Sequence, residues 1–153
     1  MTLARWMSDV APSMEYAMKA AGTNQDAFLY LVQIGYCARV IDNVLDGDKE
    51  VTVADLMDAF EVLCSRIPTN PFYVENIREV QPLQTLAWEG WKQSNELVKG
   101  SQTDKIYAHV YRDIILELYP IVALLTQGYN AMIEVRNEMK EYFKDTWVKS
   151  LTR

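Results

Sequence analysis

The stretch of residues 23–48, TNQDAFLYLVQIGYCARVIDNVLDGD, constrains the fold more than any other part of the chain. Its apolar side chains fall on every side of a helical wheel, which is typical of a helix buried all round. Four polar residues interrupt the run: Gln33, Arg39, Asp42 and Asn43. Two of them are charged, and charged side chains are costly inside a bilayer. We therefore expect residues 24–46 to form the central helix of a soluble bundle.

Capping signals mark where two helices start. Thr23 with Asp26 predicts a capping box, in which each residue accepts a hydrogen bond from the other's backbone N–H, at the start of the central helix. Thr52 with Asp55 predicts a second capping box before a helix over residues 53–66. The apolar residues of that helix keep helical spacing: Val53, Leu56, Met57, Phe60, Leu63 and Cys64.

The rest of the chain also favours helices. Helical patterns cover residues 2–21, 82–99, 102–127 and 129–151, with a short helix within 67–80. Pro82 is expected to start the helix over 82–99, and Pro120 is expected to kink the helix that contains it. No strand-like alternation of useful length is present. The prediction is an all-α, single-domain bundle of five main helices plus a short one, around the central helix.

Composition excludes several classes of function. The chain has 153 residues and a net charge of −6, which argues against sequence-independent nucleic-acid binding and against docking on anionic membranes. Two cysteines and one histidine cannot supply a Cys/His zinc site. Both cysteines, Cys37 and Cys64, lie in apolar helical contexts and are expected to be core residues in a reducing compartment. Without a secretory or lipidation signal, the expected location is the cytoplasm.

Acidic residues gather at the end of the central helix. Asp42 and Asp46 lie on one stripe with Arg39 at about 100° per residue, and Asp48 and Glu50 follow directly. Negative charge is unfavourable at a helix C-terminus, so a divalent cation held by oxygen ligands would balance it. The alternative is a helix-ending turn with Gly47 as its left-handed cap and solvated acids around it.

A second set of polar residues follows the helix that contains Pro120. His109, Asp113 and Glu117 are spaced four and four residues apart. Glu117 lies at the edge of the apolar arc, where a carboxylate should be paired or have a raised pKa. If this helix faced the central one, Asp42, Asp46, Asp113 and Glu117 could form a four-carboxylate cage for magnesium, as metal sites in helical bundles do. The alternative is a solvated stripe with local partners.

Two tryptophans share a stripe of the helix over 82–99. Gln84, Trp88, Trp91 and Asn95 recur at spacings of four, three and four. Trp88 and Trp91 could form the floor of a ligand pocket, or they could pack between helices. The expected ligand-binding residues are these two tryptophans and two residues of the central helix, Arg39 and Asn43. Arg39 would neutralise phosphate charge, and Asn43 lies beside the stripe that contains Arg39.

The segment Asp42-Asn43-Val44-Leu45-Asp46 resembles the first aspartate-rich motif, DDxxD, of all-helical isoprenoid synthases. In that family the motif ends a core helix and binds diphosphate through magnesium. The resemblance covers five residues, with Asn43 where the family has a second aspartate, and no second aspartate-rich motif follows. It implies a Mg²⁺ cofactor and a diphosphate ligand.

A longer pattern resembles small helical proteins of tailed phages whose function is unassigned. It comprises the aspartate-rich segment 41–48, the NPFY segment 70–73 and the tryptophan-rich segment 88–95. This resemblance implies a phage accessory protein, acting in the host cytoplasm if it is phage-encoded, and supplies no chemistry.

Two classes of function follow from these observations. The first is a magnesium-dependent protein that binds a diphosphate or nucleotide-like ligand. The second is a non-enzymatic accessory protein that binds a protein partner. The chain shows no nucleophile and base pair, and its single histidine disfavours Ser-His or Cys-His catalysis. Whether the protein is an enzyme, and whether it forms a homo-oligomer, stays open at this stage.

Overall fold

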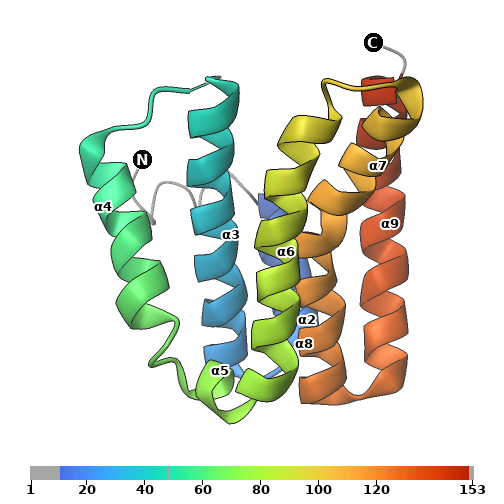
Figure 1. Ribbon diagram of the computed structural model, residues 1–153. Coiled ribbons are helices and arrows are strands. Elements are labelled where there is room, and N and C mark those ends of the chain that lie inside the picture. The colour runs from blue at the N-terminus through green and yellow to red at the C-terminus, as the bar shows by residue number, and fades with distance from the viewer. Residues whose placement is uncertain (1–10, 48, 152–153) are drawn as a thin grey trace. The chain divides into compact units, whose positions relative to one another are not determined.

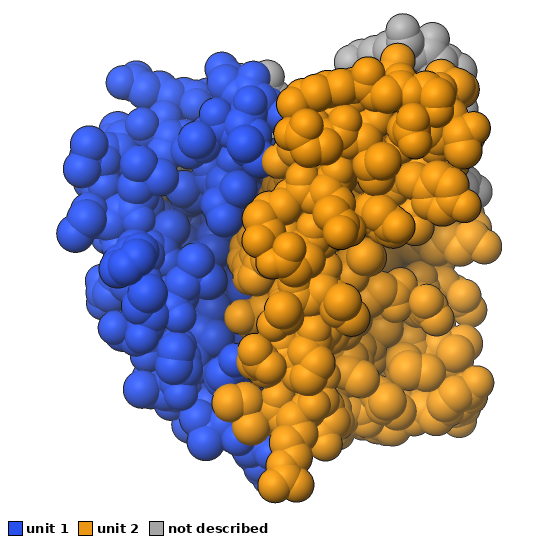
Figure 2. Space-filling model, in the orientation of Figure 1, with its two compact units in different colours: residues 1–76 blue, residues 77–153 orange. Residues whose placement is uncertain are grey.

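The computed structural model describes residues 11–47 and 49–151, and every regular element in that part of the chain is a helix (Figure 1). The predicted all-α fold is therefore confirmed. Contacts divide the chain into two compact units, Met1–Asn76 and Ile77–Arg153 (Figure 2). The single-domain organisation therefore stays a prediction.

The first unit is built around α3 (Gln25–Asp46), which contacts three other helices of the unit. These are α2 (Ala11–Ala21), α4 (Val53–Glu61) and α5 (Pro71–Glu75). A π-helical turn, η1 (Val62–Arg66), extends α4. The expected helix over residues 2–21 is confirmed from Ala11 onward, and its first nine residues lie outside the described part of the chain.

The ends of α3 are fixed by an asparagine and a glycine. Asn24 is the N-cap, and its Oδ1 accepts a hydrogen bond from the backbone N–H of Ala27 at 2.9 Å. The predicted Thr23–Asp26 capping box is therefore wrong, because the helix starts one residue later than that box requires. Gly47, at φ 68°, ends the helix in the left-handed region, and its N–H donates to the Asn43 carbonyl oxygen at 3.0 Å.

Among the described helices, α3 alone has the length and hydropathy of a membrane span, and half of its apolar window is buried inside the structure. The core helix of a soluble protein has the same properties. Tyr30, Tyr36 and Cys37 are completely buried, as the all-round apolar wheel predicted. The tyrosine ring of Tyr30 packs against Phe72 and Tyr73 of α5, with ring centroids 6.0 and 5.7 Å away.

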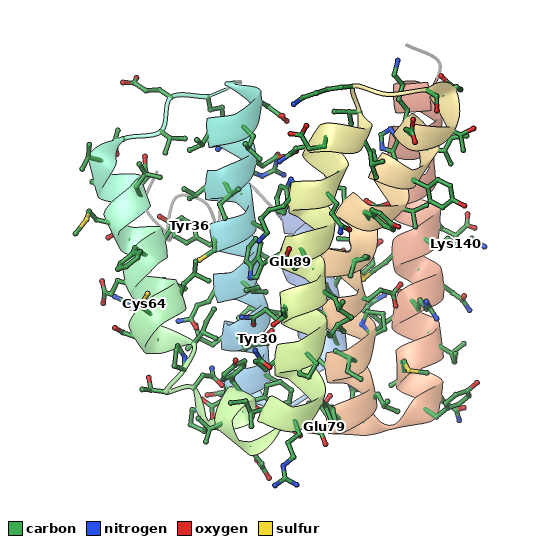
Figure 3. The ribbon with its side chains drawn as sticks, viewed as in Figure 1. Tyr30, Tyr36, Cys64, Glu79, Glu89 and Lys140 are labelled. Atoms are coloured by element: carbon green, nitrogen blue, oxygen red, sulfur yellow. The ribbon has the colours of Figure 1, made fainter. Side chains whose placement is uncertain are left out.

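The predicted capping box at the start of α4 is confirmed. Thr52 Oγ1 accepts from the Asp55 backbone N–H at 3.1 Å, and Asp55 Oδ2 accepts from the Thr52 backbone N–H at 2.8 Å. Tyr36 reaches from α3 toward α4 and donates its hydroxyl hydrogen to the Asp55 backbone oxygen at 3.4 Å (Figure 3). Cys37 Sγ donates to the Ala59 carbonyl oxygen at 3.5 Å. These contacts turn Asp55 and Ala59 toward α3.

The second unit begins with α6 (Ile77–Leu97), which packs beside α7 (Gln102–Arg112). A 3₁₀ segment, η2 (Asp113–Glu117), then leads into α8 (Leu118–Gln127), and α8 packs beside α9 (Tyr129–Leu151). The expectation that Pro82 starts a helix is wrong, since α6 begins at Ile77 and contains Pro82. A proline inside a helix removes one backbone hydrogen bond. Because α6 has 21 residues, the loss of that one hydrogen bond does not end the helix.

The helix predicted over residues 102–127, with a kink at Pro120, is divided into α7, η2 and α8. The residues just before Pro120, Asp113–Glu117, wind as a 3₁₀ helix between two α-helices. Pro120 has no N–H to donate to the carbonyl of Leu116, and its ring crowds that carbonyl. The tighter i to i+3 winding of η2 is therefore the expected local response.

Candidate functional site

A pocket of about 510 Å³ lies within the second unit and is lined by residues from five of its elements. Its apolar walls come from Leu83, Val110, Ile114, Pro120, Ile121 and Met132. Three charged residues also line it: Asp113, Glu117 and Arg136. Small-molecule sites have volumes of about 300–1,000 Å³ and combine apolar walls with a few polar groups. This pocket has both features.

Glu117 and Arg136 are paired with each other. Glu117 Oε2 lies 3.1 Å from Arg136 Nη2, which joins η2 to α9. Glu117 is therefore paired, which is one of the two outcomes expected for a carboxylate at the edge of the apolar arc. Both side chains keep substantial exposure, 40% for Glu117 and 59% for Arg136, so a ligand entering the pocket can reach either group.

The two carboxylates predicted on the helix that contains Pro120 both line this pocket. Asp113 is the first residue of η2 and Glu117 is the last, and both are half-buried. His109, the third member of the predicted stripe, lies on α7 and does not line this pocket. With two carboxylates and one guanidinium, the pocket has a formal charge of −1 from these three residues.

Arg112 ties α7 to the end of α6 beside this region. Its Nη2 donates to Asn95 Oδ1 at 3.0 Å, and its Nε donates to the buried Ser94 hydroxyl at 3.4 Å. Gly90 makes this close packing possible, because a Cβ atom there would lie 2.7 Å from the carbonyl oxygen of Tyr111. The position of η2, and with it of Asp113, therefore depends on a small residue in α6.

The end of α3 holds the other predicted acids. Arg39 Nη1 lies 3.1 Å from Asp42 Oδ2, so Arg39 neutralises a neighbouring aspartate. Asn43 is buried, whereas Asp46 is exposed and Asp48 lies outside the described residues. Gly47 supplies the left-handed helix end that the alternative interpretation of this segment required.

The two predicted ligand-binding tryptophans, Trp88 and Trp91, pack against each other. The rings of Trp88 and Trp91 stack with centroids 6.0 Å apart and an interplanar angle of 12°. Trp91 is buried, and its Nε1 has no hydrogen-bond partner among the described residues. Neither ring lines the pocket of the second unit. Their role as ligand-binding residues stays a prediction.

The four acids predicted to form a magnesium cage divide between the units: Asp42 and Asp46 lie in the first unit and Asp113 and Glu117 in the second. Within the described part of the chain, no group of three or more His, Cys, Asp and Glu side chains is placed to hold a metal ion. A cage made only of protein carboxylates therefore has no support there.

Sequence reasoning missed Arg136. It follows Met132 by four residues on α9, so the two side chains lie on one helix face, and that spacing was the available signal. Its pairing with Glu117 depends on how α9 packs against α8 and could not be read from spacing.

Comparisons with protein-family models, with curated proteins and with solved structures found no match to this chain. The resemblances to isoprenoid synthases and to phage proteins therefore stay predictions.

Proposed function

We propose that the pocket of the second unit binds a small phosphorylated organic ligand, of the diphosphate or nucleotide type, together with Mg²⁺. The observation that carries this proposal is the convergence of Asp113, Glu117 and Arg136 on one pocket with apolar walls. The apolar walls would take the organic part of the ligand, and the charged residues would take its phosphates.

The residues present fit magnesium when the ligand shares in its coordination. Mg²⁺ keeps several waters and is usually bound by one or two carboxylates plus substrate phosphates, rather than by an all-protein cage. Asp113 and Glu117 supply two carboxylates to the pocket.

Charge balance makes the ion a condition for binding. The three charged residues sum to −1, so they repel a phosphate unless a cation is bound. Mg²⁺ would reverse that sign, and Arg136 could then turn from Glu117 to a phosphate oxygen, which guanidinium groups bind well. The proposal includes binding and no reaction step, and its setting is the cytoplasm, that of the host if the protein is phage-encoded.

Thermal melts with Mg²⁺, with inorganic diphosphate and with both test this function. A ligand that binds only the folded state raises the melting temperature by mass action. We expect a rise only when both are present, and we expect Asp113→Asn and Glu117→Gln to abolish it. A rise with diphosphate alone would contradict the magnesium requirement.

A second function, binding of a protein partner by a non-enzymatic accessory protein, is favoured by a different observation. The apolar residues of α4 in the first unit are exposed: Val53, Leu56, Met57 and Phe60. Monomeric proteins seldom expose such residues together without a role in binding.

A further inference from the structure

The apolar face of α4 points away from its packing partner. Val53, Met57 and Phe60 keep 76%, 64% and 66% of their surface exposed, and Leu56 keeps 47%. Asp55 and Ala59, on the same helix, keep only 4% and 7%. The helix therefore buries a carboxylate and a small side chain while its large apolar side chains face solvent. We call the four exposed residues the α4 stripe.

Helix geometry explains this reversal. With Asp55 at zero on the wheel and about 100° per residue, Ala59 lies about 40° away, while Val53, Met57 and Phe60 lie about 140–160° away. Tyr36 and Cys37 of α3 donate hydrogen bonds to the backbone oxygens of Asp55 and Ala59, which fixes the inward side. The α4 stripe is therefore held outward by specific contacts.

The spacing of the α4 stripe matches a helical partner. Its members recur at i, i+3, i+4 and i+7, the anchor pattern by which one amphipathic helix packs on another. From Val53 to Phe60 the stripe is about 10 Å long at 1.5 Å per residue, or about two helical turns.

The net charge of the segment around α4 favours one kind of partner. Of the two exposed acids of α4, Glu61 lies beside the stripe and pairs with Arg66 of η1 at 3.2 Å, whereas Asp58 lies on the other side of the helix. Residues 46–66 contain six acids and two bases, a net charge of −4. A second copy of this chain, itself at −6, would bring acids against acids. A partner helix with basic residues beside its apolar stripe would place opposite charges together.

We propose that the α4 stripe binds an amphipathic helix whose apolar side chains are flanked by Lys or Arg. This inference deepens the second function above and rests on it, and it is independent of the ligand pocket in the other unit. The apolar side chains supply the affinity, and the net negative charge of residues 46–66 favours a basic partner over an acidic one.

Fluorescence anisotropy with two labelled peptides of about four turns tests the inference. Both carry leucine at i, i+3, i+4 and i+7, one flanked by lysines and the other by glutamates. We expect the basic peptide to bind and the acidic peptide to bind at least tenfold more weakly. Phe60→Ser and Met57→Ser should each weaken the basic peptide at least tenfold. Leu86→Ser, at a 59% exposed apolar position of α6, is the matched control and should change nothing.

Stability measurements keep the variants interpretable. Because Phe60 and Met57 are largely exposed, their serine variants should keep the melting temperature of the parent. Lower melting temperatures would show that the α4 stripe is packed in solution and would overturn the inference.

The remaining outcomes distinguish a general protein-binding role of the α4 stripe from the specific binding of a basic helix. Equal binding of both peptides that Phe60→Ser abolishes would overturn the basic partner and leave a protein-binding surface. No binding of either peptide would overturn both. A dimer in sedimentation that Phe60→Ser dissociates would assign the α4 stripe to a second copy instead. Binding to vesicles of phosphatidylserine and phosphatidylcholine that Phe60→Ser abolishes would assign it to a membrane surface.

Discussion

Glu117 and Arg136 join η2 to α9 through an ion pair of 3.1 Å that also lines the pocket of the second unit. Because both side chains are substantially exposed, water and salt screen their attraction. A half-exposed pair of this kind is better placed to exchange partners with a ligand than to hold the fold together.

Arg136→Gln should therefore lower the free energy of unfolding by at most about 1 kcal/mol, the usual range for exposed ion pairs. Urea denaturation with the parent and the variant measures this difference. Arg66→Gln, which removes the exposed Glu61–Arg66 pair at 3.2 Å, is the matched control and should behave alike. A loss of several kcal/mol at Arg136 alone would show that the pair is structural, and the exchange described above would then be excluded.

Gly90→Ala should destabilise the second unit by about 1–3 kcal/mol, the usual cost of forcing an extra carbon into a packed core. The added Cβ would lie 2.7 Å from the Tyr111 carbonyl oxygen and 3.1 Å from Ile114 Cδ1, so α6 would have to move away from α7 and η2.

The free energy of unfolding from urea denaturation is again the measure. In a helix, Gly→Ala otherwise stabilises by about 1 kcal/mol. A gain at Gly90 would therefore contradict the close packing of α6 on α7. Gln93→Ala, at an exposed position of the same helix, should change stability little.

The two cysteines should differ in reactivity. Burial raises the pKa of the Cys37 thiol to about 12, and its hydrogen bond to the Ala59 carbonyl oxygen holds it in the core. Cys64 is exposed, which corrects the expectation that both cysteines are core residues (Figure 3). A thiol reagent at neutral pH should modify Cys64 quickly and Cys37 only after unfolding.

Cys64→Ser should leave no rapidly reacting thiol in the folded protein. Fast modification of Cys37 in that variant would contradict the packing of α4 on α3, because this packing is what covers the thiol.

Stability should fall as the pH rises above about 9. Burial raises the pKa of Cys37 from 9.0 to about 12 and that of Tyr119 from 10.0 to about 12, and it raises the pKa of Tyr30, Tyr36 and Tyr73. In the unfolded chain these groups lose their protons first, so the unfolded state gains stability between pH 9 and pH 12.

Thermal melts from pH 7 to pH 11 check this. Tyr119→Phe removes one of the groups and should make the fall less steep. A melting temperature that stays constant across the range would contradict the burial of these side chains.

Particular residues show how far the sequence could predict the structure. The capping box of Thr52 and Asp55 and the left-handed Gly47 were predictable, because each depends on neighbours along the chain. The outward orientation of Phe60 was not, since hydropathy favours burying it. Contacts from α3, which is distant in sequence, decide which side of α4 faces inward.

The candidate site was predictable in part for the same reason. Asp113 and Glu117 could be singled out by their spacing on one helix, and both line the pocket. Arg136, which completes the charged set, comes from α9, and helix packing alone brings it to Glu117. Asp42 and Asp46 looked equivalent to the pocket acids in sequence, but both lie in the first unit and neither lines this pocket.

The most direct test of the proposed function is the melting temperature with Mg²⁺ and inorganic diphosphate in the parent, in Glu117→Gln and in Asp46→Asn. A ligand at about 100 times its Kd stabilises by about 2.7 kcal/mol, a shift of about 5–10 °C for a chain of this size. We expect that shift in the parent and in Asp46→Asn, and none in Glu117→Gln. No shift in the parent, or a shift lost in Asp46→Asn and kept in Glu117→Gln, would contradict the proposed function.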